Sequence, residues 1–297
     1  MAFGVCWRRA SIALTACICF GLPTSGVMAQ QGKVAEDALE AFDQNSFDRS
    51  TSIDNKWFPL QPGTQLVYKG FTQEENKRLP RRVVQTVTDL TKVIDGVRAV
   101  VVWDVDYKDD ELNESEIVFF AQDKKGNVWQ LGELVEIYED AELVGAHSWI
   151  AGLDGARAGL MMKADPRPGT SSYSQGYAPP PLNWTDRAKV EQVGQKTCVQ
   201  AGCYNDLLVI AESSKKEGPH AQQLKYYAPG VGYVRVAWRG KAEKLKETLE
   251  LAEIVKLSPD ALAKARAEAL EIEKRAYRYG RTPPAELTQT APSAGDR

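Results

Sequence analysis

The side chains of this chain best suited to acid–base chemistry are His147 and His220, its only histidines. A hydrolase of the common serine type would show a Gly-x-Ser-x-Gly turn, and a zinc protease would show His-Glu-x-x-His. The sequence contains neither motif. An enzyme built on this sequence would be a hydrolase that pairs His147 with a carboxylate of the segment 141–184. The missing nucleophile motif favours a non-enzymatic protein, and we assign no catalytic residue.

Carboxylates gather in WDVDYKDDELNESE, residues 103–116. Carboxylate and carbonyl oxygens are the ligands of Ca²⁺, so this segment could hold calcium. It lacks the spacing of an EF-hand loop, and a solvated hairpin turn explains it better. DKKGN, residues 123–127, is likewise typical of a β-turn. The sequence therefore predicts no metal site and no cofactor.

Cys198 and Cys203 are the only cysteines after residue 29. In an exported protein such a pair favours a disulfide, here across the end of a hairpin. A loop this small would stabilise the fold by about 2 kcal/mol in the chain-entropy model. A catalytic dithiol is the weaker alternative because four residues, rather than two, separate the cysteines. Zinc would need two more ligands, and neither histidine is close in sequence.

Residues 1–29 have the form of a secretory signal. A short head ends at Arg9, an apolar run follows, and small residues precede a cleavage point after Ala29. Gly, Pro, Thr and Ser interrupt the run, which makes it a poor transmembrane span. The alternative is a lipoprotein signal that would lipidate Cys17. Either way, the protein is predicted to be exported, to the periplasm or the extracellular space.

The charge of the mature chain argues against nucleic acid as a partner. Cleavage removes two of the 37 Lys and Arg, which leaves 35 against 40 Asp and Glu. Nucleic-acid binding requires a basic surface instead.

The pattern of residues 53–256 is that of β-strands, because apolar and polar residues mostly alternate. Trp103 and Val105 fall on one face of such a run, with Asp104 and Asp106 on the other. Short turns separate about ten runs, and short turns join neighbouring strands in antiparallel pairs. The sequence predicts a mainly β domain, an antiparallel meander that forms a curved sheet or half-barrel.

The two ends of the chain differ from this domain. A helix is predicted over residues 258–280, with Ser258 as its N-cap and Pro259 in its first turn. Its narrow Ala-rich stripe favours packing on the domain, with binding of a partner or of a second copy as the alternative. Residues 281–297 are predicted to be a disordered tail. Residues 30–52 form an N-terminal segment with an expected short helix in KVAEDALEAFDQ.

The segment 141–184 is rich in Gly, Pro, Ser and Tyr and shows little periodicity. Long irregular segments inside compact domains are uncommon, and they often carry function. The alternative is a connection that covers an open edge of the sheet and buries its aromatic rings there. The predicted ligand-binding residues are Trp149, Tyr173, Tyr177, Trp184 and His147.

Two further segments carry sequence motifs. YYAPGVGYVRV, residues 226–236, is Gly-rich, but a phosphate-binding loop should open a helix and here a strand follows. A tight turn at Pro229-Gly230, with a bulge or close backbone approach at Gly232, is therefore predicted. Near the start of the domain, IDNKWFPLQPGTQLVYKG spans residues 53–70.

These segments, with AQDKKGNVWQLGE between them, resemble a broad group of uncharacterised secreted bacterial proteins. That group opens with FPL-x-PGT-x-x-x-Y-x-G and closes with a Y-x-PGVG-x-V hairpin, and the resemblance covers about residues 53–255. The layout is similar to that of TapB-like β proteins and, more loosely, to LolA-type half-barrels that hold lipid. The resemblance implies a secreted β fold and transfers no catalytic residue. The Cys198–Cys203 pair is not part of its pattern.

Together these features predict an exported soluble protein that binds rather than catalyses. The expected partner is an apolar small molecule, a lipid or an envelope protein.

The mature chain is predicted to start at Gln30. Intact-mass measurement of the exported protein should show loss of residues 1–29. A retained signal, or a diacylglyceryl group on Cys17, would contradict this assignment.

Overall fold

The structure is a computed structural model that describes residues 38–74, 77–214, 221–240, 245–276 and 282–288. The predicted signal and Cys17 lie outside the described residues. So do the last residues of the predicted helix and most of the C-terminal tail.

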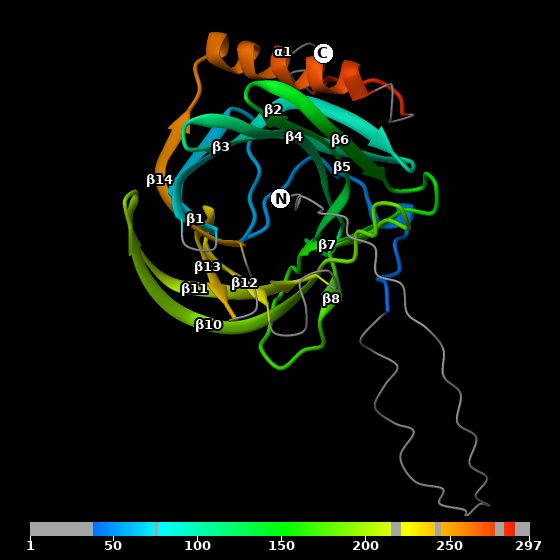
Figure 1. Ribbon diagram of the computed structural model, residues 1–297. Helices are drawn as coiled ribbons and strands as arrows, with labels where there is room; N and C mark the ends of the chain where they lie inside the picture. Colours follow the sequence, from blue (N-terminus) through cyan, green and yellow to red (C-terminus); the bar gives the residue numbers. More distant parts are fainter. Residues whose placement is uncertain (1–37, 75–76, 215–220, 241–244, 277–281, 289–297) are drawn as a thin grey trace, which may run out of the picture. The chain divides into compact units, whose positions relative to one another are not determined.

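Antiparallel strands make up more than half of the described residues, which confirms the predicted mainly β fold (Figure 1). The strands are β1 (Thr64–Glu74), β2 (Lys77–Ile94), β3 (Val97–Lys108), β4 (Glu111–Gln122), β5 (Val128–Glu139), β6 (Glu142–Ile150), β7 (Arg157–Met162), β8 (Tyr173–Ser174), β9 (Gly176–Tyr177), β10 (Arg187–Val199), β11 (Gly202–Ser213), β12 (Gln222–Ala228), β13 (Gly232–Arg239), β14 (Leu245–Lys256) and β15 (Glu286–Leu287). They form one sheet in the order β8-β10-β11-β12-β13-β14-β1-β2-β3-β4-β5-β7-β9, with β6 on β5 and β15 on β2.

The sheet curls, and the path of paired strands does not close (Figure 1). Its two end strands, β8 and β9, are nevertheless neighbours in sequence, with only Gln175 between them. β8 pairs with β10, and β9 pairs with β7. The segment Tyr173–Tyr177, which we call the clasp, therefore links the two ends of the sheet through the chain itself.

Close backbone packing explains the glycines at the clasp. A Cβ on Gly159 of β7 would lie 2.0 Å from the backbone nitrogen of Gly176. Gly176 has a φ of +143°, and a Cβ there would lie 2.5 Å from the ring of Trp149. Only glycine fits at both positions.

The segment 141–184 was predicted to be irregular, and this is wrong for much of it. It contains β6, β7, β8 and β9. Leu143 and Val144 of β6 are exposed, so this strand lacks the expected apolar alternation. β8 and β9 have two residues each, and pairing with distant strands rather than local propensity defines them.

The two motif segments that carry the family resemblance meet in space. The backbone N–H of Gly230 donates to the carbonyl of Lys56 over 2.7 Å. The ring centroid of Phe58 lies 6.4 Å from that of Tyr227 and 5.2 Å from that of Phe120. The Pro229-Gly230 tight turn is confirmed, because Val231 N–H donates to the carbonyl of Ala228. These motifs build one end of the core.

Helix α1 (Pro259–Ala276) packs across the outside of the curl over β2, β4 and β5 (Figure 1). Ser258 Oγ accepts from the N–H of Ala261, which confirms the predicted N-cap. The residues of α1 buried against the sheet are Ala265, Ala269, Ile272, Glu273 and Ala276. The Ala-rich stripe thus packs on the domain.

Charged pairs fix α1 to the sheet. Arg275 donates two hydrogen bonds of 2.7 and 2.8 Å to the fully buried carboxylate of Glu136 on β5. Lys92 of β2 forms a buried ion pair with Glu273. Burial lowers the pKa of Lys92, and the contact with Glu273 opposes that shift.

Part of the predicted disordered tail is ordered. β15 pairs with Leu90 and Thr91 of β2, in a stretch that extends beyond the pairing of β2 with β1. It covers an edge that would otherwise present unpaired backbone groups. The short helix expected in KVAEDALEAFDQ is absent from its described residues 38–43, and one 3₁₀ turn (Gln44–Ser46) follows.

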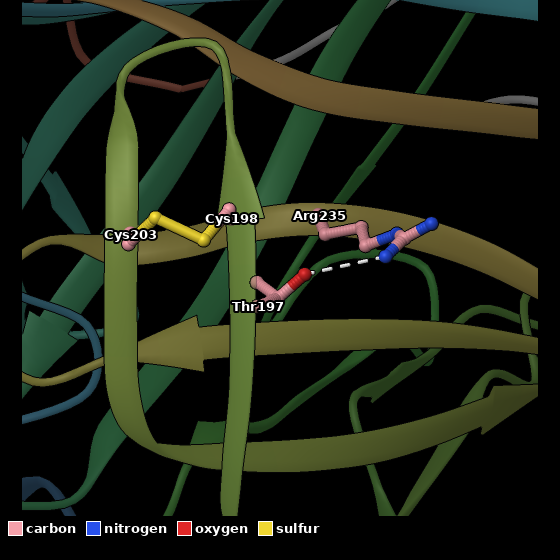
Figure 2. The surroundings of a disulfide bond; sticks show 4 residues. All are labelled: Thr197, Cys198, Cys203 and Arg235. Carbon is pink, nitrogen blue, oxygen red and sulfur yellow. Dashed lines mark hydrogen bonds between the residues drawn. A yellow bond between two sulfur atoms is a disulfide. The ribbon is translucent and has the colours of Figure 1, made fainter.

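The Cys198–Cys203 disulfide crosses the end of the β10–β11 hairpin, as predicted (Figure 2). Thr197, the neighbour of Cys198, accepts a hydrogen bond from Arg235 of β13 over 3.2 Å. The N–H of Ala201 donates to the carbonyl of Leu251 on β14. The hairpin end is therefore held both covalently and by contacts with two other strands.

Removing one partner of the buried pair at α1 should strongly destabilise the protein. Glu273→Ala leaves Lys92 buried without its counter-ion, which costs about 3–5 kcal/mol of unfolding free energy. It also removes the acceptor for the N–H of Ala285, next to β15. Glu271→Ala is the matched control, because the Glu271–Lys274 pair is exposed and should cost at most about 0.5 kcal/mol. Urea denaturation measures both, and equal costs would contradict the assignment.

Candidate functional site

A row of polar side chains crosses the sheet at one level. Antiparallel pairing places Gln85 opposite Asp104, Asp104 opposite Glu116, Glu116 opposite Val135, and Val135 opposite His147. Directly paired residues point to the same face of a sheet. One face of β2 to β6 therefore carries two carboxylates and an imidazole in line.

A second row lies two residues further along the strands. Here Val83 is opposite Asp106, and Asp106 is opposite Glu114. Because side chains alternate between faces, Asp106 and Glu114 share the face of Asp104 and Glu116. Like charges directly opposite each other are destabilising. Two such pairs on neighbouring levels therefore need compensation.

This face is the one turned away from α1. Glu136, which binds Arg275 of the helix, alternates on β5 with Glu133 and Val135. α1 lies on the convex side of the curled sheet (Figure 1). The two rows and Glu133 therefore line the concave side, which we call the inward face.

The prediction of a solvated hairpin turn for these acids is wrong for four of them. Asp109 and Asp110, at the turn itself, are exposed. Asp106, Glu114 and Glu116 are each at least 93% buried, and Asp104 is partly exposed. In the sequence, Asp104 and Asp106 stand two residues apart, as do Glu114 and Glu116, which places each pair on one face of its strand. Only the strand register and the curl of the sheet show that this face is buried.

The second row has an internal cation. Arg81 forms an ion pair with Asp106, including a hydrogen bond of 2.7 Å from Nε to Oδ1. Its Nε also lies 3.4 Å from Oε1 of Glu247 on β14. Arg81 therefore offsets charge on both sides of the row, as a buried ion pair must to be tolerated.

Neutral amides donate the hydrogen bonds to Asp104 and Glu133. Gln85 donates to Oδ2 of Asp104 over 3.2 Å, and Gln130 donates to Oε2 of Glu133 over 3.1 Å. The other oxygens, Oδ1 of Asp104 and Oε1 of Glu133, are buried and accept no hydrogen bond from the described residues. Each such atom in a native structure calls for an explanation, such as a bound ligand, ion or water.

These environments shift the acidity of both groups. Burial, with a smaller contribution from Glu116, raises the pKa of Asp104 to about 7. Burial, again followed by the charge of Glu116, raises the pKa of Glu133 to about 8. Both carboxyl groups therefore exchange protons close to neutral pH.

His147 lies beside this cluster. Its Nε2 is 3.9 Å from Oε1 of Glu133, and its side chain is 21% exposed. The carboxylate that it approaches belongs to β5 and not to the segment 141–184. The hydrolase alternative therefore keeps His147 with a different acid from the one expected.

The structure joins some of the predicted aromatic residues to the cluster. Trp149 is opposite Glu133 on the inward face, and its ring stacks on Trp184 with 6.0 Å between centroids. Trp149 and Tyr173 are at least 97% buried, whereas Tyr177 and Trp184 are partly exposed. Tyr173 packs separately in the clasp, where the ammonium of Lys163 lies over its ring. A ligand-binding role for these rings stays a prediction.

An ion pair separate from the two carboxylate rows lies beside the clasp. Glu212 of β11 pairs with Lys225 over 2.7 Å and accepts a hydrogen bond from Gln175 over 2.9 Å. The buried hydroxyls of Tyr173 and Tyr227 have no hydrogen-bond partner among the described residues. The inward face is thus polar over much of its extent.

Among the described residues, no group of three or more His, Cys, Asp or Glu side chains is arranged to hold a metal ion. Among the same residues, no helix combines the length and the apolar content that crossing a membrane requires.

The raised pKa values of Asp104 and Glu133 predict how stability depends on pH. A group with a higher pKa in the folded state stabilises the fold when protonated; this contribution is complete below the unfolded pKa and is lost as pH rises through the folded value. Glu133→Gln should unfold at about the wild-type temperature at about pH 4, where the glutamate is protonated in both states, and at a higher temperature at about pH 8.5. Glu142→Gln removes an exposed charge from β6 and should follow the wild type. A gap between Glu133→Gln and wild type that does not change with pH would contradict the assignment.

Two solved structures share a distant likeness with this chain. No protein-family model matches it, and no curated protein matches it. A solved structure from Bacteroides fragilis, provisionally described as an exported protein with a YmcC-like fold, aligns over 67% of this chain and 99% of its own at 15% identity and a TM-score of 0.40. A provisionally described lipoprotein from Parabacteroides distasonis aligns over 68% of this chain and 100% of its own at 13% identity and a TM-score of 0.36. Both likenesses are too distant to bear on function.

Proposed function

We propose that this chain is an exported, non-enzymatic binding protein whose ligand lies against the inward face of the curled sheet. The observation that carries the proposal is the pair of buried oxygens, on Asp104 and Glu133, that accept no hydrogen bond from the described residues. A carboxylate taken out of water without a partner costs several kcal/mol. A bound ligand that supplies the missing partners would offset this cost.

Solvent access supports a binding role. Asp104 is partly accessible to solvent, although its Oδ1 atom is buried. Binding sites typically combine solvent access with a few convergent polar groups.

The carboxylate rows of the inward face suit a polar or charged group. The aromatic end of the core, formed by Phe58, Phe120 and Tyr227, is at least 95% buried, so these rings pack on one another. The ligand predicted from sequence, an apolar molecule or an envelope partner, would therefore need a polar or charged portion to meet this face.

Hydrolysis is the second candidate, and one observation favours it. His147 approaches Glu133, and a buried carboxyl group with a raised pKa is a common feature of catalytic sites. Binding is the better-supported function, because the sequence has no nucleophile motif next to this pair.

Purification of the exported protein from its host, followed by native mass spectrometry, tests the proposal. The wild type and Glu142→Gln should carry the same non-covalently bound small molecule, and Glu133→Gln should carry much less of it. Circular dichroism controls for folding of each variant. Protein that is free of small molecules in all three preparations would overturn the proposed function. Conversion of the captured molecule by wild type but not by His147→Ala would favour the hydrolase instead.

A further inference from the structure

Asp104, Glu116 and Glu133 form a continuous line of carboxylates over three strands. Asp104 of β3 is directly opposite Glu116 of β4. Glu116 is opposite Val135 of β5, and Glu133 precedes Val135 by two residues on the same face. Glu133 is therefore the diagonal neighbour of Glu116, within reach of its side chain.

Three buried acids elsewhere in the described fold have basic side chains as partners. Glu136 binds Arg275, Glu273 binds Lys92, and Asp106 binds Arg81. At Asp104 and Glu133 the hydrogen-bond donors are neutral amides, and one oxygen of each carboxylate accepts no hydrogen bond from the described residues. The basic group nearest to that oxygen of Glu133 is the imidazole of His147, with Nε2 at 3.9 Å. Glu133 is 98% buried, so water outside the protein does not reach this oxygen.

We propose that Asp104, Glu116 and Glu133 bind an organic cation with two primary ammonium groups, a linear diamine or polyamine. This inference rests on the proposed binding function and names the class of ligand. One ammonium donates to Oε1 of Glu133 and the other to Oδ1 of Asp104, with Glu116 between them. The ligand supplies a positive charge of the kind that Arg275, Lys92 and Arg81 supply at other buried acids.

The spacing of the carboxylates favours two ammonium groups over one ion. Asp104 and Glu133 lie on the two strands that flank β4, and neighbouring strands are about 4.8 Å apart. Their backbones are therefore about 10 Å apart, so the two acids approach the concave side from separate strands. The described residues also hold no cluster of ligands suited to a metal ion. Two linked charges span this distance better than one.

The chemistry of the lone oxygens favours primary ammonium over quaternary ammonium. A carboxylate oxygen accepts hydrogen bonds, and a primary ammonium has three N–H donors. A quaternary ammonium has none and is recognised by aromatic faces instead. Trp149, the ring opposite Glu133, is 97% buried, and Trp184 stacks on it. This leaves hydrogen bonding to carboxylates as the main means of recognition.

The charged surroundings determine how binding varies with pH. The titratable and charged groups that face the cluster are Glu114 and Glu116 of β4, His147 of β6, Asp186, and Lys225 of β12, which is paired with Glu212. A cation competes with the protons held by Asp104 and Glu133. Affinity should therefore rise from about pH 6 to about pH 8.5, with protons released on binding.

Isothermal titration calorimetry with 1,4-diaminobutane and spermidine tests the proposal on the mature protein. Titration in two buffers of different ionisation enthalpy should show proton release near neutral pH. Glu133→Gln and Asp104→Asn should each weaken binding by about tenfold or more, the cost of losing one charge-assisted hydrogen bond. Glu142→Gln, which removes an exposed carboxylate, should bind like the wild type. Choline and CaCl₂ should bind at least about tenfold more weakly than the diamines.

Three outcomes would overturn the inference. They are no heat of binding with either amine, equal affinity for choline and diaminobutane, or equal loss of affinity in Glu133→Gln and Glu142→Gln. The native mass measurement separates this inference from the proposed function. A retained ligand that is neutral or anionic would leave the binding function standing and exclude the diamine.

Discussion

A carboxylate that leaves water loses several kcal/mol of hydration, and this sheet buries many of them. On its convex side two buried ion pairs attach α1: Glu136 with Arg275 and Lys92 with Glu273. On the inward face Arg81 pairs with Asp106, whereas the hydrogen bonds to Asp104 and Glu133 come from amides, with the imidazole of His147 3.9 Å from Glu133. The charges that attach α1 are therefore paired within the chain, whereas one oxygen each of Asp104 and Glu133 accepts no hydrogen bond from the described residues. The proposed function and the proposed ligand both follow from this difference.

The curl of the sheet places these carboxylates on its concave side, where we propose that the ligand binds. Strand register alone would place Asp104, Glu116 and His147 in one line on an open surface. The clasp links the ends of the sheet, and the close approach of Gly159 to Gly176 keeps that link tight. It also packs against Trp149, which shares the inward face with Glu133. Through Trp149, the clasp is therefore in contact with the face that carries Glu133.

Much of the fold could be predicted from the sequence, because alternation and turn residues are local signals. The antiparallel strands, the Ser258 cap and the Cys198–Cys203 bond follow from such signals. The clasp could not be predicted, since strands of two residues exist only through pairing with β7 and β10. The spacing of Asp104, Asp106, Glu114 and Glu116 could be seen in the sequence, but their burial depends on which face of the sheet is concave. That property belongs to the whole sheet and to no single segment.

The central claim is that Asp104 and Glu133 are buried carboxyl groups that titrate near neutral pH. An NMR titration of the side-chain carboxyl carbons, with Asp104→Asn and Glu133→Gln used for assignment, measures this directly. The account predicts midpoints at about 7 for Asp104 and about 8 for Glu133 in the ligand-free protein. Midpoints of about 4 for both groups, the value of ordinary exposed carboxyl groups, would contradict it.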